Sequence, residues 1–230
     1  DPDNQELQHI LAALHETNTS LRAPGIYLTN LFNQYAPYYD KHLTEHLRYQ
    51  APKALFDLIR EHCLHPDPQW SILDLGCGTG LAGEIVKPLA KKLTGIDISA
   101  EMITAAKQKN LYDALYTDDI DTLLPTMDAN NLIIAADVLS YYGELLPVFQ
   151  LCHNNLTEEG LLTFTVEKGS STDYLLQKTL RYCHSQSYIE KALHDTGFML
   201  LDLDNIILRE QRRKPVHGFA VIAKKINKTR

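Results

Sequence analysis

The 230-residue sequence contains no long apolar run, no paired-cysteine motif and no excess of basic residues. No apolar stretch approaches the roughly 20 residues that a membrane-spanning helix needs, and the N-terminus lacks a signal-peptide pattern. The cysteines at positions 63, 77, 152 and 183 form no CxxC pair, so we interpret them as free thiols in a reducing compartment. We therefore expect a cytoplasmic protein without membrane contact.

The charge balance is acidic, with 29 Asp and Glu residues against 22 Lys and Arg residues and a formal net charge of −7. A general nucleic-acid binder needs a basic face that displaces counterions, so we expect no nucleic-acid partner. One local basic cluster, Arg209, Arg212, Arg213 and Lys214, precedes several lysines near the C-terminus. We interpret it as a solvated hairpin tip and tail rather than as a binding stripe.

The most informative stretch is Ser71–Gly80, in which the apolar run Ile72–Leu75 contains only Asp74 and is followed by glycines at 76, 78 and 80. This pattern predicts a buried parallel strand that enters a tight turn and opens a helix. Glycine leaves no side chain between the backbone and a ligand, and it allows positive φ. The dinucleotide-binding fingerprint needs its third glycine one position later, where this chain has Leu81.

At this point the sequence resembles the class I S-adenosylmethionine-dependent methyltransferases, whose first motif reads Leu-Asp-x-Gly-x-Gly-x-Gly. Ile72–Gly80 matches every defining position of that motif. The resemblance implies an S-adenosylmethionine site that includes Asp74, Gly76, Cys77 and Gly78. A glycine turn without a ligand is the alternative.

A second buried strand, 93–97, ends in Asp97, which follows the third glycine by 17 residues (97 − 80). A carboxylate at this strand end is placed to accept both ribose hydroxyls, a feature that NAD enzymes share. The following Ile98 and Met102 resemble the apolar residues that flank adenine in methyltransferases. Ser99 also suits the N-cap of the next helix.

Further along the chain, a short third strand leads to Asp118, Asp119 and Ile120. Methyltransferases often place an acidic residue here against the adenine amino group, and the backbone of the next residue supports the ring edge. The resemblance therefore extends the cofactor site to all three residues, with Asp119 and Ile120 in the best alignment. The alternative is that the two aspartates only cap a helix that starts near Ile120.

The fourth strand and its exit loop, 131–143, contain Ala135, Asp137 and Tyr141. Ligands bind at the carboxyl ends of strands in a doubly wound sheet, so we expect Ala135 beside the cofactor and the other two beside the reacting methyl. The Asn/Asp-Pro-Pro-Tyr/Phe motif of nucleic-acid and glutamine amine methyltransferases is absent here. This absence and the net charge favour a small-molecule acceptor.

The N-terminal region predicts a helix over residues 4–16, a linker over 18–25 and an aromatic-rich helical stretch over 27–39. Residues 31–43 resemble bacterial predicted methyltransferases that carry tetratricopeptide repeats before the catalytic domain, except that Asn33 replaces the usual Asp. If that pattern holds, Tyr35, Tyr39 and Tyr49 are lid residues near the methionine end of the cofactor, since a sulfonium is attracted to aromatic faces. The alternative is a plain helical cap, and this extension is also a possible contact for a protein partner.

The last two predicted strands, 199–209 and 216–224, are joined so closely that they must form an antiparallel hairpin. We therefore predict an α/β fold with a doubly wound, mostly parallel seven-stranded sheet, a C-terminal antiparallel hairpin and an N-terminal helical cap. Residues 1–50 would form the helical extension or lid, and residues 51–230 the methyltransferase domain.

The catalytic candidates are Asp137, Tyr141 and His184, and His184 titrates most readily near neutral pH. His184 lies in the segment 181–185, in which Arg181 and the phenol of Tyr182 also suggest a grip on an acidic substrate or, equally, an ion-paired surface turn. The H-x-x-E-H match at 42–46 is a short zinc-protease pattern, and we expect no metal there. The remaining alternatives are a nicotinamide-dependent oxidoreductase and a catalytically silent interaction module.

Overall fold

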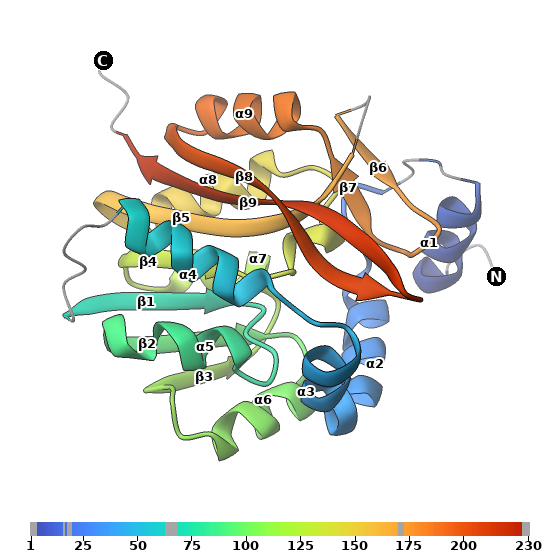
Figure 1. The fold of residues 1–230 in the computed structure, drawn as a ribbon, viewed down its shortest axis with the longest axis horizontal. Helices are drawn as coiled ribbons and strands as arrows, with labels where there is room; N and C mark the ends of the chain where they lie inside the picture. The colour runs from blue at the N-terminus through green and yellow to red at the C-terminus, as the bar shows by residue number, and fades with distance from the viewer. Residues whose placement is uncertain (1–3, 16, 18–19, 63–68, 170–172, 227–230) are drawn as a thin grey trace.

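The computed structural model describes residues 4–15, 17, 20–62, 69–169 and 173–226. Within these residues one nine-stranded sheet forms the centre of the molecule (Figure 1). Its strands are β1 (Trp70–Leu75), β2 (Ala90–Asp97), β3 (Ala114–Thr117), β4 (Asn130–Ala135), β5 (Leu156–Lys168), β6 (Tyr174–Leu176), β7 (Tyr182–His184), β8 (Phe198–Gln211) and β9 (Lys214–Lys225).

Five strands, in the order β3-β2-β1-β4-β5, run parallel, β9 pairs antiparallel with β5, and β8 pairs antiparallel with β9. These seven strands confirm the predicted mostly parallel sheet with its terminal hairpin. The β6–β7 hairpin was not predicted. β7 pairs with β5 only at Glu167 and Lys168, past the residues of β5 that pair with β4. It therefore lies at the carboxyl edge of the sheet.

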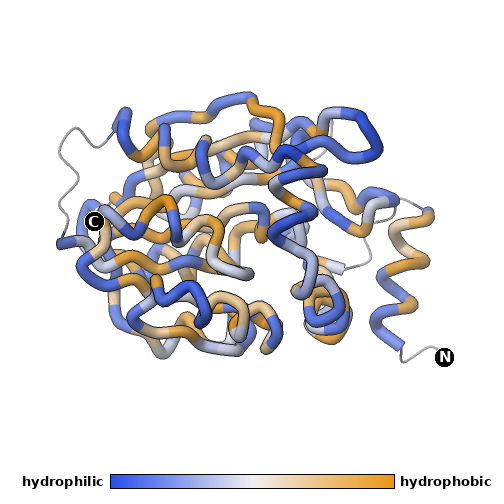
Figure 2. The backbone as a smooth tube through the Cα atoms, turned by 60° about the horizontal axis from the view of Figure 1, so that its bottom comes forward, coloured by the Kyte–Doolittle hydropathy of each residue, from blue (hydrophilic) through white to orange (hydrophobic). Residues whose placement is uncertain are grey.

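Helices cover both faces of the sheet because side chains along each buried strand alternate between two apolar clusters. Ile72 packs with α4 (Ala51–His62) and α5 (Leu81–Val86) on one face, and Leu73 packs with α8 (Leu146–Asn154) and α9 (Gln186–Asp195) on the other. Helices α6 (Ala100–Gln108) and α7 (Ile120–Leu123) follow β2 and β3. In Figure 2, hydrophobic residues recur along the inner segments of the chain, and hydrophilic residues are frequent along the outer ones.

The N-terminal region forms α1 (Gln5–Leu14), α2 (Gly25–Tyr35) and the short turns η1 (Ala36–Tyr38), α3 (Tyr39–Lys41) and η2 (His42–His46). Several backbone hydrogen bonds tie it to the domain. Among them, Ala23 N–H donates to Tyr141 O at 2.8 Å, and Gly143 N–H donates to Leu21 O at 2.8 Å. The α2–α3 segment lies beside α6, at the carboxyl ends of the strands (Figure 1). The N-terminal region thus covers the edge where a ligand is expected.

The interpretation of the basic cluster as a solvated hairpin tip is wrong for Arg209. Its side chain is buried under the β8–β9 hairpin, whereas Arg212, Arg213 and Lys214 are exposed as predicted. Cys77, Cys152 and Cys183 are buried free thiols, and Cys63 lies outside the described residues. The helices of the described chain include none with the length and apolar character needed to cross a membrane.

Candidate functional site: a lidded cavity over the glycine turn

The glycine turn after β1 uses backbone conformations that other residues rarely adopt, with φ of 61° at Gly76, 53° at Gly78 and 94° at Gly80. A Cβ on Gly76 would lie 2.5 Å from Val138 Cγ2, inside van der Waals contact. A Cβ on Gly78 would find its nearest neighbour, the ring of Tyr39, at 3.8 Å. Gly76 is therefore required for packing, whereas Gly78 leaves open the space between the turn and the lid.

Asp97 closes β2 and faces this turn. Its Oδ2 accepts the N–H of Gly78 at 2.8 Å, and its Oδ1 accepts the N–H of Ser99 at 2.9 Å. Burial raises the pKa of Asp97 to about 6, although these two N–H donors lower it. Each carboxylate oxygen keeps a second acceptor position, so Asp97 is fixed in orientation and still able to receive hydroxyl donors.

A cavity lies above the turn, with about 600 Å³ of space that is partly open to solvent. Its lining combines the glycine turn, carboxylates at the ends of β2, β3 and β4, and aromatic rings of the lid. Predicted residues that line it are Tyr39, Gly76, Gly78, Asp97, Ile98, Met102, Asp118, Asp119, Ile120, Asp137 and Tyr141. The fold therefore brings most of the predicted site together around one space.

At one end of the cavity, Asp119 is engaged by the N-terminal region. Arg22 donates to both of its carboxylate oxygens, at 3.0 and 2.7 Å, and also pairs with Asp121. The guanidinium of Arg22 lies over the ring of Tyr142, 4.8 Å from the ring centroid. Asp118 is exposed, and its carboxylate accepts the N–H of Asp119 at 2.7 Å. Asp118 is thus the more accessible carboxylate of the two.

At the other end, Asp137 follows β4 in the left-handed region, with φ of 61°. Its N–H donates to Thr165 Oγ1 at 2.9 Å, and its carboxylate accepts two bonds from Arg209 Nη1, at 3.1 and 3.0 Å. Tyr141 is buried beside it, and the ring of Phe32 meets the Tyr141 ring edge-on at 5.6 Å. Burial raises the pKa of Tyr141, so its hydroxyl is protonated at neutral pH.

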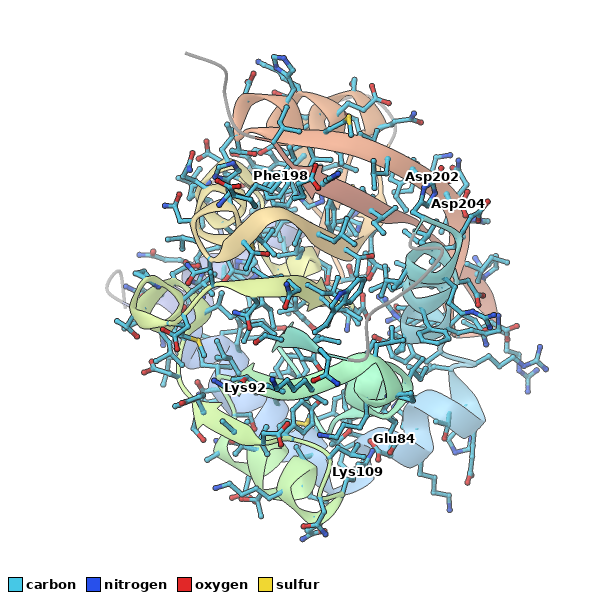
Figure 3. All side chains as sticks on the ribbon, turned by 90° about the vertical axis from the view of Figure 1, so that its left-hand side faces the viewer. Glu84, Lys92, Lys109, Phe198, Asp202 and Asp204 are labelled. Carbon is cyan, nitrogen blue, oxygen red and sulfur yellow. The ribbon has the colours of Figure 1, made fainter. Side chains whose placement is uncertain are left out.

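Three polar contacts hold the α2–α3 segment over the cavity. Ser99 Oγ donates to Asn33 Oδ1 at 2.7 Å. The side-chain amide of Asn33, which replaces the usual Asp, thus still provides an acceptor oxygen. Asp40 accepts from Thr79 Oγ1 and pairs with Lys109 at 2.8 Å, and Lys109 also pairs with Glu84 at 2.8 Å. Figure 3 shows Glu84, on α5, close to Lys109, which directly follows α6. These contacts give the segment the position of a lid.

Several predicted cofactor residues lie outside the main cavity. Tyr49 and Cys77 line a smaller neighbouring space of about 250 Å³, which also borders Tyr39. Tyr35 lines neither space and hydrogen-bonds to His42 Nδ1 at 2.6 Å. Ala135 is buried in the strand, and the next residue, Ala136, lines the cavity instead.

Asp74 also points away from the cavity. Its Oδ2 accepts the hydroxyl of Tyr112 at 2.7 Å, while its buried Oδ1 has no hydrogen-bond partner among the residues that the structure describes. Burial raises the pKa of Asp74 to about 7, opposed by the Tyr112 bond and reinforced by the charge of Asp97. Asp74 therefore supports the turn from behind and does not reach the cavity.

The prediction of His184 as a candidate base does not fit its position. Its ring is fully buried in β7, Nε2 lies 3.0 Å from the carbonyl oxygen of Gly143, and it does not line the cavity. Burial lowers the pKa of His184 to about 4, so the ring is neutral at physiological pH. Nearby, the hydroxyl of Tyr182 donates to Ser20 O at 2.8 Å, which leaves Arg181 as the member of the segment beside the site.

The H-x-x-E-H match forms no metal cluster: in the described part of the chain, the only group of three potential ligands close enough to share an ion is Glu61, His62 and Asp202. Six residues that line the cavity were not singled out as site residues from the sequence, although Leu28 and Phe32 belong to the predicted lid stretch and Ala136 and Val138 to the exit loop of the fourth strand. The six are Arg22, Leu28, Phe32, Ala136, Val138 and Tyr142. Arg22 lies in the predicted linker, where no local pattern marked it, whereas Ala136 and Val138 adjoin a predicted site residue.

Comparison with known proteins agrees with this geometry. A family model described as a methyltransferase domain matches residues 73–162. The ubiquinone biosynthesis O-methyltransferase of Glaesserella parasuis is 27% identical over 114 residues, which cover 46% of this chain and 48% of that protein. The chain thus spans about half the length of this curated relative.

Solved structures share the fold. An S-adenosylmethionine-dependent methyltransferase from Clostridium acetobutylicum superposes with a TM-score of 0.63 at 21% identity. The superposition covers 86% of this chain and 100% of that one. Magnesium protoporphyrin IX methyltransferase from Synechocystis, with bound S-adenosylmethionine, gives 0.60 at 19% identity and covers 76% and 78% of the two chains. The [4+2]-cyclase SpnF also gives 0.60, at 20% identity and 75% and 80% coverage. The chain therefore has the Rossmann-like methyltransferase fold, in which more than one reaction occurs.

Proposed function

We propose that this protein transfers the methyl group of S-adenosylmethionine to a small-molecule acceptor by in-line displacement in the lidded cavity. The observation that carries the proposal is the pairing of Gly78 with Asp97 under the lid. The turn carries no side chain at Gly78, and the Asp97 carboxylate is oriented by that same glycine's N–H with acceptor positions to spare. A nucleoside needs both features, a close backbone approach and an acceptor for adjacent hydroxyls.

In this proposal, each part of the cavity has a distinct task. Asp97 accepts the ribose hydroxyls, Ile98 and Met102 flank the adenine, and Asp118 or Asp119 accepts from its amino group. Tyr39 presents its ring to the cationic end of the cofactor, with Tyr49 behind it. S-adenosylmethionine would supply an electrophilic methyl group on a good leaving group, so the protein mainly has to position the acceptor and exclude water.

The acceptor end of the cavity, beside Asp137 and Tyr141, is where we place the methyl acceptor. It offers a hydrogen-bond donor rather than a free base. Asp137 is occupied by Arg209, so we assign it to orienting its neighbours and not to proton removal. Tyr141 keeps its proton and can donate a hydrogen bond to the acceptor. This favours an acceptor that loses its proton to water, or carries none, at the attacking atom.

The test of this function is calorimetry with S-adenosylhomocysteine, followed by incubation with methyl-labelled S-adenosylmethionine and fractionated cell extract. We expect one-to-one binding and label in a small molecule. Asp97→Ala should weaken binding, while Arg60→Gln, at an exposed position of α4, should not. Unchanged affinity in Asp97→Ala would contradict the proposal.

Two other functions remain distinct outcomes of the same experiment. A catalytically silent module would bind S-adenosylhomocysteine and label nothing. An enzyme with a reaction other than methyl transfer would give the same result, and the [4+2]-cyclase shows that this fold can catalyse one. A nicotinamide-dependent oxidoreductase would show a thermal shift with NADH and none with S-adenosylmethionine. The glycine spacing and the terminal hairpin argue against it.

We also infer, from the resemblance to methyltransferases that carry tetratricopeptide repeats, that the N-terminal extension contacts a protein partner in the cytoplasm. Its support in the described chain is α1, whose Leu7, Leu11 and Leu14 are 41%, 46% and 58% exposed. Replacing Leu7 and Leu11 with Ser should abolish capture of the partner and leave binding of S-adenosylhomocysteine unchanged. Retained capture would contradict this inference.

A further inference from the structure

A four-residue charge cluster lies beneath the acceptor end of the cavity. It comprises Asp137 after β4, Glu167 in β5, Arg181 before β7 and Arg209 in β8. These residues come from four separate segments, and their side chains are between 3% and 21% exposed. Two carboxylates face two guanidinium groups, so the cluster is balanced in charge.

Arg209 donates to both carboxylates. Its Nη1 donates to the two oxygens of Asp137 at 3.1 and 3.0 Å, and its Nη2 donates to Glu167 Oε1. Glu167 Oε2 is taken by Gln177 Nε2 at 2.7 Å. The side chain of Arg209 is 3% exposed, so it has no access to a ligand. Its role is structural.

Arg181 is held differently. Its Nη1 lies 3.5 Å from Asp137 Oδ2 and 3.5 Å from Glu167 Oε1, at the outer limit of a hydrogen bond. Arg181 does not itself line the cavity, but its guanidinium lies 5.3 Å from the ring centroid of Tyr141, which does, and its side chain is 21% exposed. A guanidinium carries five N–H donors in a planar fork that matches a carboxylate. Arg181 is therefore the accessible and less strongly engaged cation of the cluster.

The hydroxyl groups around Arg181 suit the same ligand. Burial raises the pKa of Tyr39 and Tyr141, and the charge of Arg181 lowers it without reversing the shift. These phenols stay protonated at neutral pH, so they add no negative charge beside Arg181 and remain hydrogen-bond donors. A guanidinium beside neutral phenols is an environment for an anion with an aromatic or apolar body.

We propose that Arg181 binds a carboxylate group of the methyl acceptor, with Arg209 keeping Asp137 and Glu167 paired when Arg181 turns to its ligand. This inference rests on the proposed function because it assigns the acceptor class of that same cavity. The purely structural alternative, in which Arg181 only neutralises the two carboxylates, predicts no ligand selectivity.

The test uses benzoate as a carboxylate probe and benzamide as its uncharged counterpart, measured by ligand-observed NMR on protein saturated with S-adenosylhomocysteine. We expect wild type and the surface control Arg60→Gln to bind benzoate at least about tenfold more tightly than benzamide. Arg181→Gln should lose that preference, and Arg181→Lys should restore part of it. A further arm separates the labelled acceptor by anion exchange at neutral pH, and we expect label in the retained fraction.

The inference is overturned if benzoate and benzamide bind equally, if neither binds, if Arg181→Gln keeps the preference, or if the label elutes unretained. Denaturant unfolding and calorimetry of each variant accompany the NMR, so that loss of the preference counts only in folded protein that still binds S-adenosylhomocysteine. Failure of wild type to bind S-adenosylhomocysteine would instead contradict the proposed function, which keeps the two failures distinguishable.

Discussion

Arg209 and Asp137 meet through a single guanidinium nitrogen, which lies 3.1 and 3.0 Å from the two carboxylate oxygens. Asp137 follows the central strand β4, and Arg209 lies 72 residues later in β8. The C-terminal hairpin therefore closes the floor of the cavity from the far end of the chain. This contact also explains how Asp137 is held in the left-handed region, with φ of 61°.

The first prediction concerns this pair. Arg209→Gln should destabilise the protein by about 3–5 kcal/mol, because it leaves two buried carboxylates with one weakly placed cation. Arg209→Lys keeps the charge and should cost less. Urea unfolding measures both variants, and a loss under about 1 kcal/mol for Arg209→Gln would mean that the pair is not a buried ion pair in solution.

The second prediction compares two glycines of one turn. Gly76→Ala places a Cβ 2.5 Å from Val138 Cγ2 and should reduce stability most. Gly78→Ala meets no atom closer than 3.8 Å, so it should cost only the roughly 1–2 kcal/mol of a left-handed alanine and mainly weaken cofactor binding. Thermal unfolding and calorimetry with S-adenosylhomocysteine separate the two effects. If Gly76→Ala and Gly78→Ala each lose affinity in proportion to the stability that they lose, the result would argue against a ligand over Gly78.

The third prediction is a pH dependence of binding. Ribose hydroxyls bind the ionised form of Asp97, whose pKa burial raises to about 6. Affinity for S-adenosylhomocysteine should therefore be full above pH 7 and fall as the pH drops through about 6. Asp97→Asn should bind about as weakly as the protonated wild type at every pH and lose this dependence. A wild-type affinity that stays flat between pH 5 and about 7.5 would contradict the role of Asp97.

The fourth prediction concerns stability and Asp74. Its folded pKa of about 7 lies above the ordinary value of 3.8, so between these values the folded state binds more protons than the unfolded state. This group's contribution to stability is therefore complete below its ordinary pKa and is lost as the pH rises to about 7. Asp74→Asn mimics the neutral form and should remove that loss. Urea unfolding at pH 5 and about 7.5 should show a smaller pH effect in the variant than in wild type.

The parts of the site that could be predicted are local in sequence. The strand, glycine turn and helix around Gly78, and the strand that ends at Asp97, follow from apolar periodicity and glycine spacing within a few residues. The hairpin of β8 and β9 followed from its short connection. These elements are decided by their own residues, so the fold could be predicted without tertiary information.

The parts that could not be predicted depend on contacts between distant segments. Arg209 resembles its exposed neighbours in sequence, and only the pairing of β9 with β5 carries it beneath Asp137. His184 has the residue type of a base, but β7 turns it into the core. Arg22 reaches Asp119 from 97 residues away. Such relationships arise from tertiary packing, which local patterns do not encode.

The most direct test of the account is calorimetric titration of the wild-type protein and of Asp97→Ala with S-adenosylhomocysteine at neutral pH. The account predicts one binding site with a dissociation constant in the range of about 1 µM–1 mM that enzymes use for small substrates. It predicts that Asp97→Ala weakens binding at least about tenfold, because two hydroxyl donors lose a charged acceptor. No heat of binding in wild type, or equal affinity in the two proteins, would contradict it.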